Sequence, residues 1–222
     1  MSGLTLRIDS GIAEIELDDG KVNALSESML DSLLDAIAQA ATADAALLIT
    51  GRSGCFSGGY DRKLIDAGGP ACDAMRAAGD RLTMALLDYP APVVIACTGH
   101  AMAKAAFMLL LADYRIGSEG AFRVALNEVA IGMTMPRPAM RLAEARLAAH
   151  WLSRCALQAQ SLKPADALDA GFFDELLPAE QVLERARDKA RALSALPRQA
   201  YRETRALLNG ALRAEIAALM SP

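Results

Sequence analysis

Two short runs of almost purely apolar residues constrain the fold of this chain most strongly. Ala45–Thr50 and Val93–Cys97 are too short for buried helices, and each is followed by a turn that contains glycine, which predicts two buried strands. Helical periodicity runs through residues 26–37 and 71–88, before and after the first strand. Apolar strands that alternate with helices are typical of a largely parallel sheet covered by helices. We therefore expect an α/β fold in the first part of the chain.

The remaining periodicities complete this prediction. Alternating apolar residues in 4–8 and 12–17, around Asp9-Ser10-Gly11, predict a hairpin. Ser26 is placed to cap the helix that follows. An apolar helix is expected over 103–112 and a short strand over 114–116, and from Pro138 onward the pattern is almost entirely helical, apart from a short strand near 173–177. We divide the chain into a core, residues 1–162, and a helical C-terminal region, residues 163–222.

Composition excludes several classes of function. The 222 residues are 53% hydrophobic with a net charge of −4, and no run rich in Lys or Arg suggests nucleic-acid binding. The longest apolar run, Ala105–Ala112, is too short to span a membrane, and the N-terminus lacks a signal-peptide pattern, so we expect a cytoplasmic protein. No Cys-x-x-Cys spacing occurs, so no metal site is expected and the cysteines are interpreted as buried free thiols: Cys55, Cys72, Cys97 and Cys155.

Two turns after the apolar strands have the features of a ligand site. The stretch CFSGGYD, residues 55–61, places two adjacent glycines where backbone N–H groups can approach a ligand closely. The stretch TGHAMAK, residues 98–104, also leads from a buried strand into a helix. Two helix starts that face one cavity would supply the two N–H donors that an oxyanion needs. Glycine turns after strands are common, so spacing alone leaves a plain turn open in both places.

Glu128 is the third feature that suggests chemistry. It lies between Leu126 and the run Val129-Ala130-Ile131, where a carboxylate is costly unless it is paired or used. Burial would raise its pKa and suit it to proton transfer. The alternative is a structural residue that caps a helix. His100 has no evident catalytic partner and is interpreted as a packing or hydrogen-bonding residue.

Taken together, these segments resemble the crotonase superfamily, the enoyl-CoA hydratase/isomerase group. CFSGGYDRK is similar to the first oxyanion segment of the family, ACTGHAMAKAAFMLLLADYRIGSEGAF to the second, and ALNEVAIGMTMP to the segment with the catalytic glutamate. Asn23-Ala24-Leu25 before the first long helix extends the similarity over residues 4–190. The resemblance implies a spiral of ββα turns, an acyl-CoA thioester substrate, an enolate-like intermediate, no separate cofactor, and a homotrimer or dimer of trimers.

The resemblance assigns roles residue by residue. The oxyanion donors would be the backbone N–H groups of Tyr60 and Lys104, although most relatives have glycine at the second position. Gly58 and the stretch Asp61-Arg62-Lys63 would contact the substrate, the latter at the CoA nucleotide. An ordinary solvated helix face is the alternative for Arg62 and Lys63.

The acid and base residues separate the reactions of this family. Hydratases carry two glutamates; here Phe107 occupies the position of the first, and Ala101–Ala112 contains no carboxylate. Glu128 matches the second. A single base is the arrangement of the Δ3,Δ2-enoyl-CoA isomerases, in which one carboxylate takes a proton from C2 and returns it to C4. We expect Phe107, Leu126 and Ile131 to wall the cavity. An isomerase is favoured; hydratase or hydrolase activity, and a CoA-thioester-binding protein without turnover, stay open.

The last helix carries an apolar face that needs a partner. We expect this face to pack on the chain's own spiral or on a neighbour within a trimer, and its members are Leu207, Leu208, Leu212, Ile216 and Leu219.

Overall fold

A six-stranded sheet forms the centre of the computed structural model, which describes residues 3–220. Its order is β1-β2-β3-β5-β7-β9, in which β1 and β2 form an antiparallel hairpin and every other pair is parallel. The strands are β1 (Leu4–Asp9), β2 (Ile12–Leu17), β3 (Ala46–Gly51), β5 (Val93–Cys97), β7 (Tyr114–Ser118) and β9 (Glu175–Leu177). The predicted hairpin, the two buried strands and the short late strand are confirmed.

A second, parallel sheet consists of three shorter strands, in the order β4-β6-β8. These strands are β4 (Gly54–Ser57), β6 (Gly99–Met102) and β8 (Val124–Ala125). The sequence analysis interpreted residues 55–61 and 98–104 as turns, and this was wrong in part. The strands are too short and too rich in glycine and polar residues to stand out, and they form because they pair with one another.

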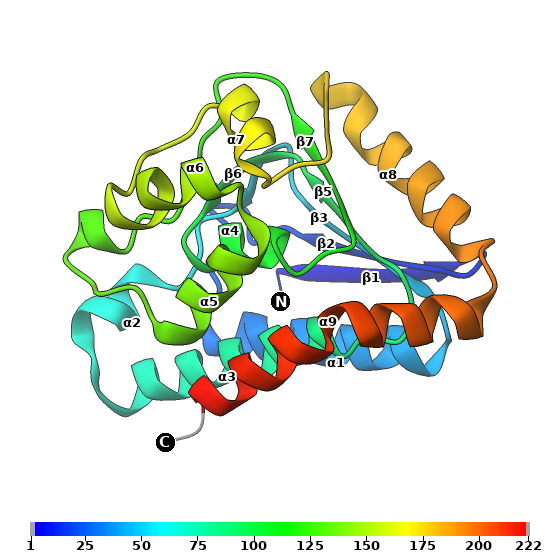
Figure 1. The fold of residues 1–222 in the computed structure, drawn as a ribbon, viewed down its shortest axis with the longest axis horizontal. Helices are drawn as coiled ribbons and strands as arrows, with labels where there is room; N and C mark the ends of the chain where they lie inside the picture. Colours follow the sequence, from blue (N-terminus) through cyan, green and yellow to red (C-terminus); the bar gives the residue numbers. More distant parts are fainter. Residues whose placement is uncertain (1–2, 221–222) are drawn as a thin grey trace.

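Each turn of the chain contributes one strand to each sheet and then a helical segment, which is the crotonase-like spiral of ββα units. After β3 and β4 come α2 (Arg62–Ala67) and α3 (Gly69–Leu87), and after β5 and β6 comes α4 (Lys104–Leu109). After β7 and β8 comes a single 3₁₀ turn, Val129–Ile131. The three segments that leave the small sheet are therefore brought to one side of the molecule (Figure 1).

Helices cover both faces of the large sheet. On one face lies α1 (Glu27–Thr42), which packs on α3; α3 in turn contacts α9 (Arg198–Met220). On the other face, α8 (Ala179–Ser194) crosses β3, β5 and β7 (Figure 1). Strand β3 is apolar throughout because Leu47 and Ile49 enter the main core, whereas Ala46 and Leu48 belong to a separate cluster with residues of α8.

Local signals account for the position of α1. Ser26 accepts a hydrogen bond from the Met29 backbone N–H at 3.3 Å, which confirms the predicted cap. Met29, Leu30 and Leu33 are buried along the predicted apolar face.

The C-terminal region packs closely on this core. It begins beyond α5 (Arg137–Arg146), α6 (Ala149–Leu152) and a π-helical turn, Ser153–Leu157, and contains α7 (Pro164–Ala170), β9, α8 and α9. Because β9 extends the large sheet beside β7, residues 163–222 share that sheet with the earlier part of the chain. No helix within residues 3–220 is long and apolar enough to cross a membrane.

The predicted apolar face of the last helix is divided in the structure. Leu212 and Ile216 are buried in the chain's own core, together with Asn209 and Arg205. Arg205 pairs with Asp113 at 2.9 Å and donates hydrogen bonds to carbonyls at the end of α3. Leu207 and Leu208 remain 83% and 71% exposed. The buried face thus follows the spacing 205, 209, 212 and 216 and includes two polar residues, which the sequence analysis missed.

Candidate active site

A cavity of about 330 Å³ lies between α3, α4, the segment after β8, α5 and the end of α9. It brings together four of the predicted site residues: Tyr60, Lys104, Phe107 and Glu128. The other lining residues are Arg76, Asp80, Thr83, Met133, Thr134, Pro136, Pro138, Ala139, Leu142, Leu219 and Met220.

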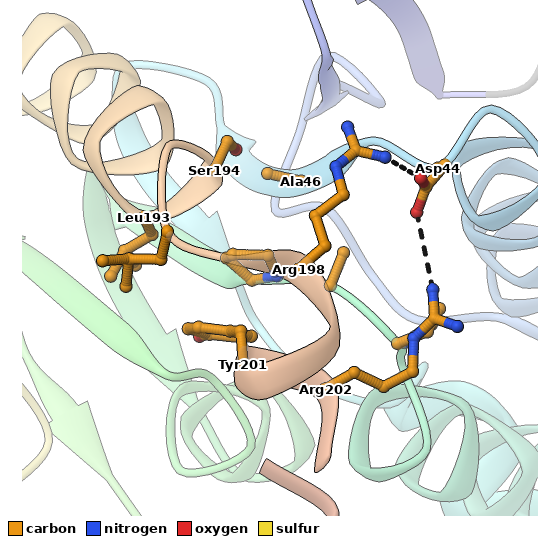
Figure 2. A pocket seen from close by; sticks show the side chains of 11 residues that line it. Asp44, Ala46, Leu193, Ser194, Arg198, Tyr201 and Arg202 are labelled. Atoms are coloured by element: carbon orange, nitrogen blue, oxygen red, sulfur yellow. Dashed lines mark ion pairs between the residues drawn. The ribbon is translucent and has the colours of Figure 1, made fainter. Parts of the chain in front are cut away.

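A second hollow, at the start of α9, is too small to hold a ligand. Figure 2 shows Arg198 and Arg202 converging on Asp44, with which both form ion pairs, and the free space beside them is only about 20 Å³. This contact ties α9 to the loop between α1 and β3, so we assign it a structural role.

The backbone conformation and the close neighbours of Gly59 explain why the segment before α2 needs glycine. Its φ is +82°, and a Cβ atom there would lie 2.6 Å from the Met102 carbonyl oxygen and 3.3 Å from the Lys104 backbone nitrogen. Only glycine permits this approach. The two segments that follow β4 and β6 are therefore held against each other at the cavity, as the oxyanion interpretation requires.

The Tyr60 N–H group has no hydrogen-bond acceptor in the part of the chain that the structure describes. Leu25 and Tyr60 form an isolated parallel bridge, in which the Leu25 N–H donates to the Gly59 carbonyl at 2.8 Å. In a parallel bridge one residue, here Leu25, bonds to the chain neighbours of the other, so the N–H of the other residue, here Tyr60, points away from the partner segment. Within residues 3–220 the Tyr60 N–H donates no hydrogen bond, so it can serve a ligand.

The Lys104 N–H group is also unused by the described part of the chain, because Lys104 is the first residue of α4. Ala103 before it adopts φ +49° and ψ −123°, which is a strained conformation for a residue with a Cβ atom. The Ala103 N–H donates to the Ala125 carbonyl of β8 at 2.8 Å, and this bond helps to hold the strained peptide. Strained backbone conformations of this kind cluster at active sites and ligand-binding segments.

A buried polar network holds the segment that carries Tyr60. Asn23 is fully buried, and its side-chain amide donates to the Leu17 and Phe56 carbonyls at 2.8 and 3.0 Å. Ser57 donates to the Asn23 carbonyl at 2.6 Å and accepts from the Gly59 N–H at 3.1 Å. The network fixes the backbone on both sides of the two glycines, which limits the reorganisation that an oxyanion would demand.

Glu128 places a buried carboxylate on the same cavity. Its side chain is 6% exposed, and its Oε2 atom has no hydrogen-bond partner within residues 3–220. Burial raises the pKa of Glu128, and a hydrogen bond from its own backbone N–H opposes the rise. Although Glu128 precedes the 3₁₀ turn, its side chain makes no capping hydrogen bond. The helix-capping alternative therefore finds no support, and the role of Glu128 as a base stays a prediction.

The side chain of Tyr60 fills part of the space beside α3. A Cβ atom on Gly79 would lie 1.8 Å from the Tyr60 hydroxyl oxygen, so glycine is needed there as well. Burial raises the pKa of the Tyr60 hydroxyl well above its usual value, and the hydroxyl therefore stays protonated.

Three polar residues of α3 complete the cavity, and the sequence analysis missed them. Arg76, Asp80 and Thr83 follow the spacing i, i+4 and i+7, which puts them on one face of the helix. Thr83 accepts a hydrogen bond from Lys104 Nζ at 2.6 Å. Burial raises the pKa of Asp80, and the Lys104 ammonium opposes that rise.

The other predicted substrate-binding residues lie outside the cavity. Leu126 is fully buried in the core, and Ile131 is half-buried in the 3₁₀ turn. Gly58 is half-buried beside Val22. Their proposed contacts with substrate stay predictions.

The start of α2 is exposed. Asp61 caps it by accepting from the Lys63 N–H at 2.9 Å, and Arg62 pairs with Asp66 at 2.6 Å. Lys63 is exposed on the same turn.

The interpretations of His100 and the cysteines are confirmed. His100 Nδ1 accepts from the Arg123 N–H at 3.2 Å, and its ring meets Phe122 edge to face. All four cysteines are free and buried.

Comparison with known proteins places this geometry in a family. The family model for enoyl-CoA hydratase/isomerase matches residues 7–220. The human mitochondrial enoyl-CoA delta isomerase 1 is 28% identical over 208 residues, which cover 91% of this chain and 68% of the human protein.

Solved structures agree with this match. An enoyl-CoA hydratase/isomerase family protein from Pseudomonas syringae is 36% identical, with a TM-score of 0.95 over 98% of this chain and 94% of that one. An enoyl-CoA hydratase from Mycobacterium marinum is 41% identical, with a TM-score of 0.92 over 97% and 95%. The names of these relatives include both isomerases and hydratases. The chain belongs to the enoyl-CoA hydratase/isomerase family of the crotonase superfamily.

Proposed function

We propose that the protein is an enoyl-CoA isomerase that moves a double bond from C3–C4 to C2–C3 of an acyl-CoA thioester. The observation that carries this proposal is the buried carboxylate of Glu128, whose Oε2 atom has no partner within residues 3–220, on the same cavity as two backbone N–H groups that these residues leave unused. A base, an oxyanion site and an enclosed space between them are what enolate chemistry requires.

In the proposed mechanism, the thioester oxygen lies against the N–H groups of Tyr60 and Lys104. Glu128 removes a proton from C2, and the negative charge that develops on the oxygen is stabilised by the two donors. The same carboxyl group then returns the proton to C4. The raised pKa of Glu128 favours this cycle, because its carboxyl group accepts and releases a proton more evenly than an exposed glutamate.

Phe107 supports an isomerase over a hydratase. Its side chain lines the cavity at the position that resembles the first glutamate of hydratases, so no carboxylate stands there to activate water. The exposed Arg62 and Lys63 support binding of the CoA nucleotide outside the cavity.

Hydration is the second candidate, because Asp80 brings another carboxylate to the cavity. Burial is the main cause of the raised pKa of both carboxyl groups, and a different partner opposes each rise: the Lys104 ammonium for Asp80 and a backbone N–H for Glu128. Two carboxylates that work on one water molecule and one C–C bond would influence each other. Asp80 is instead coupled to Lys104, so we rank hydration second.

A panel of CoA thioesters distinguishes these functions. We expect purified protein to convert 3-hexenoyl-CoA to 2-hexenoyl-CoA, without comparable hydration of 2-hexenoyl-CoA or release of free CoA from hexanoyl-CoA. Hydration that is faster than isomerisation and is lost in Asp80→Asn would establish the second candidate. Release of CoA alone would indicate a hydrolase, and binding without turnover would leave a CoA-thioester-binding protein.

We also propose that the protein acts as a homotrimer in the cytoplasm. The exposed Leu207 and Leu208 on α9 support an interface there, because large apolar side chains that adjoin on a surface are commonly covered by a partner.

A further inference from the structure

The side chain of Lys104 enters the proposed active site and is only partly satisfied there. The residue is 8% exposed, and its ammonium group donates one hydrogen bond, to Thr83 Oγ1 at 2.6 Å. The Thr83 hydroxyl donates its own proton to the Gly79 carbonyl at 3.1 Å, so it acts toward Lys104 as an acceptor. An ammonium group has three N–H donors. Two of them therefore find no hydrogen-bond acceptor within residues 3–220.

The charges around this ammonium do not balance. Asp80 and Arg76 line the same wall of the cavity, which we call the α3 wall, together with Thr83 and Lys104. Asp80 forms no ion pair with Lys104 within 4.0 Å, and Arg76 forms none with any carboxylate of residues 3–220. On this wall two cations thus face one carboxylate, and the second carboxylate of the cavity, Glu128, forms no ion pair with either cation within residues 3–220. The nearest aromatic ring, that of Tyr60, has its centre 5.9 Å from Lys104 Nζ, which is only a weak cation–π contact.

A hydrocarbon chain alone would not benefit from this arrangement. Burial lowers the pKa of Lys104 to about 8, which reflects the cost of keeping an ammonium away from water. Other lining residues, among them Ala139, Leu142 and Leu219, already offer an apolar surface to an acyl chain. A charged residue on the α3 wall is therefore unexplained unless the bound molecule has a group that pairs with it.

We propose that Lys104 makes the cavity selective for acyl groups that end in a carboxylate, that is, for CoA thioesters of dicarboxylic acids. A carboxylate would take the two unused N–H donors and neutralise the surplus positive charge of the α3 wall. A hydroxyl or keto group would accept a hydrogen bond but leave the charge unbalanced. The inference deepens the proposed function, because it assumes that the acyl group lies in the cavity beside Glu128.

Binding of saturated thioesters tests this selectivity without any need for turnover. Calorimetry would compare pairs that differ only in a terminal carboxylate or methyl group: succinyl- and butyryl-CoA, adipoyl- and hexanoyl-CoA, suberoyl- and octanoyl-CoA. We expect the wild-type protein to bind the dicarboxylic member of at least one pair about tenfold or more tightly. Equal or weaker binding of the dicarboxylic member in all three pairs would overturn the proposal.

Variants test whether the preference for a terminal carboxylate depends on the Lys104 side chain. Lys104→Met is expected to abolish or reverse the preference, Lys104→Arg to retain part of it, and Thr83→Val to reduce it, because Thr83 anchors the ammonium. Lys163→Met removes an exposed lysine outside the cavity and is the matched control. A preference that persists unchanged in Lys104→Met would contradict the role of this side chain.

Turnover separates this proposal from the isomerase proposal. In 3-hexenedioyl-CoA the same proton transfer from C2 to C4 takes place, and the terminal carboxylate is unchanged. If neither 3-hexenedioyl-CoA nor 3-hexenoyl-CoA is isomerised, the isomerase proposal fails, and the binding series still decides the role of Lys104. If 3-hexenoyl-CoA is isomerised but no binding pair shows a Lys104-dependent preference, the isomerase stands and selectivity for a carboxylate is wrong.

Discussion

At Gly59 the chain has a φ of +82°, and a Cβ atom there would lie only 2.6 Å from the carbonyl oxygen of Met102. Gly59→Ala should push the Tyr60 segment away from Lys104 and disrupt the oxyanion site. Loss of one such donor lowers kcat by about 10²–10³. We expect a loss of that size in steady-state isomerisation of 3-hexenoyl-CoA.

Gly11 offers a matched control for this substitution. Its φ is +76°, but no atom lies within 4 Å of the place where its Cβ would stand. Gly11→Ala should therefore carry a similar backbone strain in the hairpin and keep its activity. Equal losses in the two variants would show that strain, rather than the contact between the two segments, explains the effect.

The buried carboxyl group of Glu128 also makes the stability of the folded protein depend on pH. Because burial raises its folded-state pKa, the folded protein holds this proton more tightly than the unfolded chain, and stability falls as pH rises through that interval. Glu128→Gln removes the free-energy cost of keeping an ionised carboxylate buried. We expect thermal unfolding to show a higher Tm for the variant at pH 8 and no gain below about pH 4, where an unfolded glutamate is protonated.

A gain of about 1 kcal/mol would raise Tm by about 2–4 °C in a chain of this size. Glu144→Gln, on the exposed face of α5, is the control and should leave Tm unchanged at both pH values. A Tm for Glu128→Gln that is no higher than that of the wild type at pH 8 would mean that the carboxylate is better solvated than its burial indicates.

At the scale of the elements, α9 closes the cavity with its last turn. Leu219 lines the cavity, whereas Leu207, three turns earlier, points into solvent. Leu219→Trp should fill part of the 330 Å³ and exclude longer acyl chains. We expect kcat/KM for 3-decenoyl-CoA to fall about tenfold relative to 3-hexenoyl-CoA. Leu207→Trp is the control on the same helix, and an equal change in both variants would place Leu219 away from the acyl chain.

The sequence predicted elements whose pattern is local. Strands β3 and β5 were found because both faces are covered and every position is apolar, and α1 because its cap and apolar spacing lie within one segment. The small sheet was not found. Strand β6, with Gly99 and an exposed His100, gains its stability from pairing with β4, which lies more than forty residues earlier.

The residues of the candidate site divide in the same way, into those that a local sequence pattern identifies and those that only the fold identifies. Glu128 drew attention because a carboxylate in an apolar run is unusual, and the family resemblance supplied Tyr60, Lys104 and Phe107. Arg76, Asp80 and Thr83 were missed because, along the sequence, they have the spacing of the solvated face of an amphipathic helix. Only the tertiary contact with Lys104 distinguishes that face from an ordinary one.

At the scale of the whole molecule, the proposed trimer makes a separate prediction. Leu207 and Leu208 are exposed beside each other on α9, and an assembly would cover such a surface. We expect light scattering coupled to size exclusion to give about three times the chain mass of 23.4 kDa at micromolar concentration. A mass of one chain would contradict the trimer, and an unchanged trimer in Leu207→Glu would place the interface elsewhere.

The spiral explains why a single carboxylate is enough for the proposed reaction. It brings the ends of β4 and β6 and the turn after β8 to one cavity, so in the proposed mechanism two N–H donors and one base would face the same thioester. The most direct test is the rate of 3-hexenoyl-CoA isomerisation by Glu128→Gln, measured beside Glu144→Gln and with binding of hexanoyl-CoA as a check on folding. The account predicts a loss of at least about 10² in kcat, with binding nearly unchanged. Wild-type turnover by Glu128→Gln would contradict it.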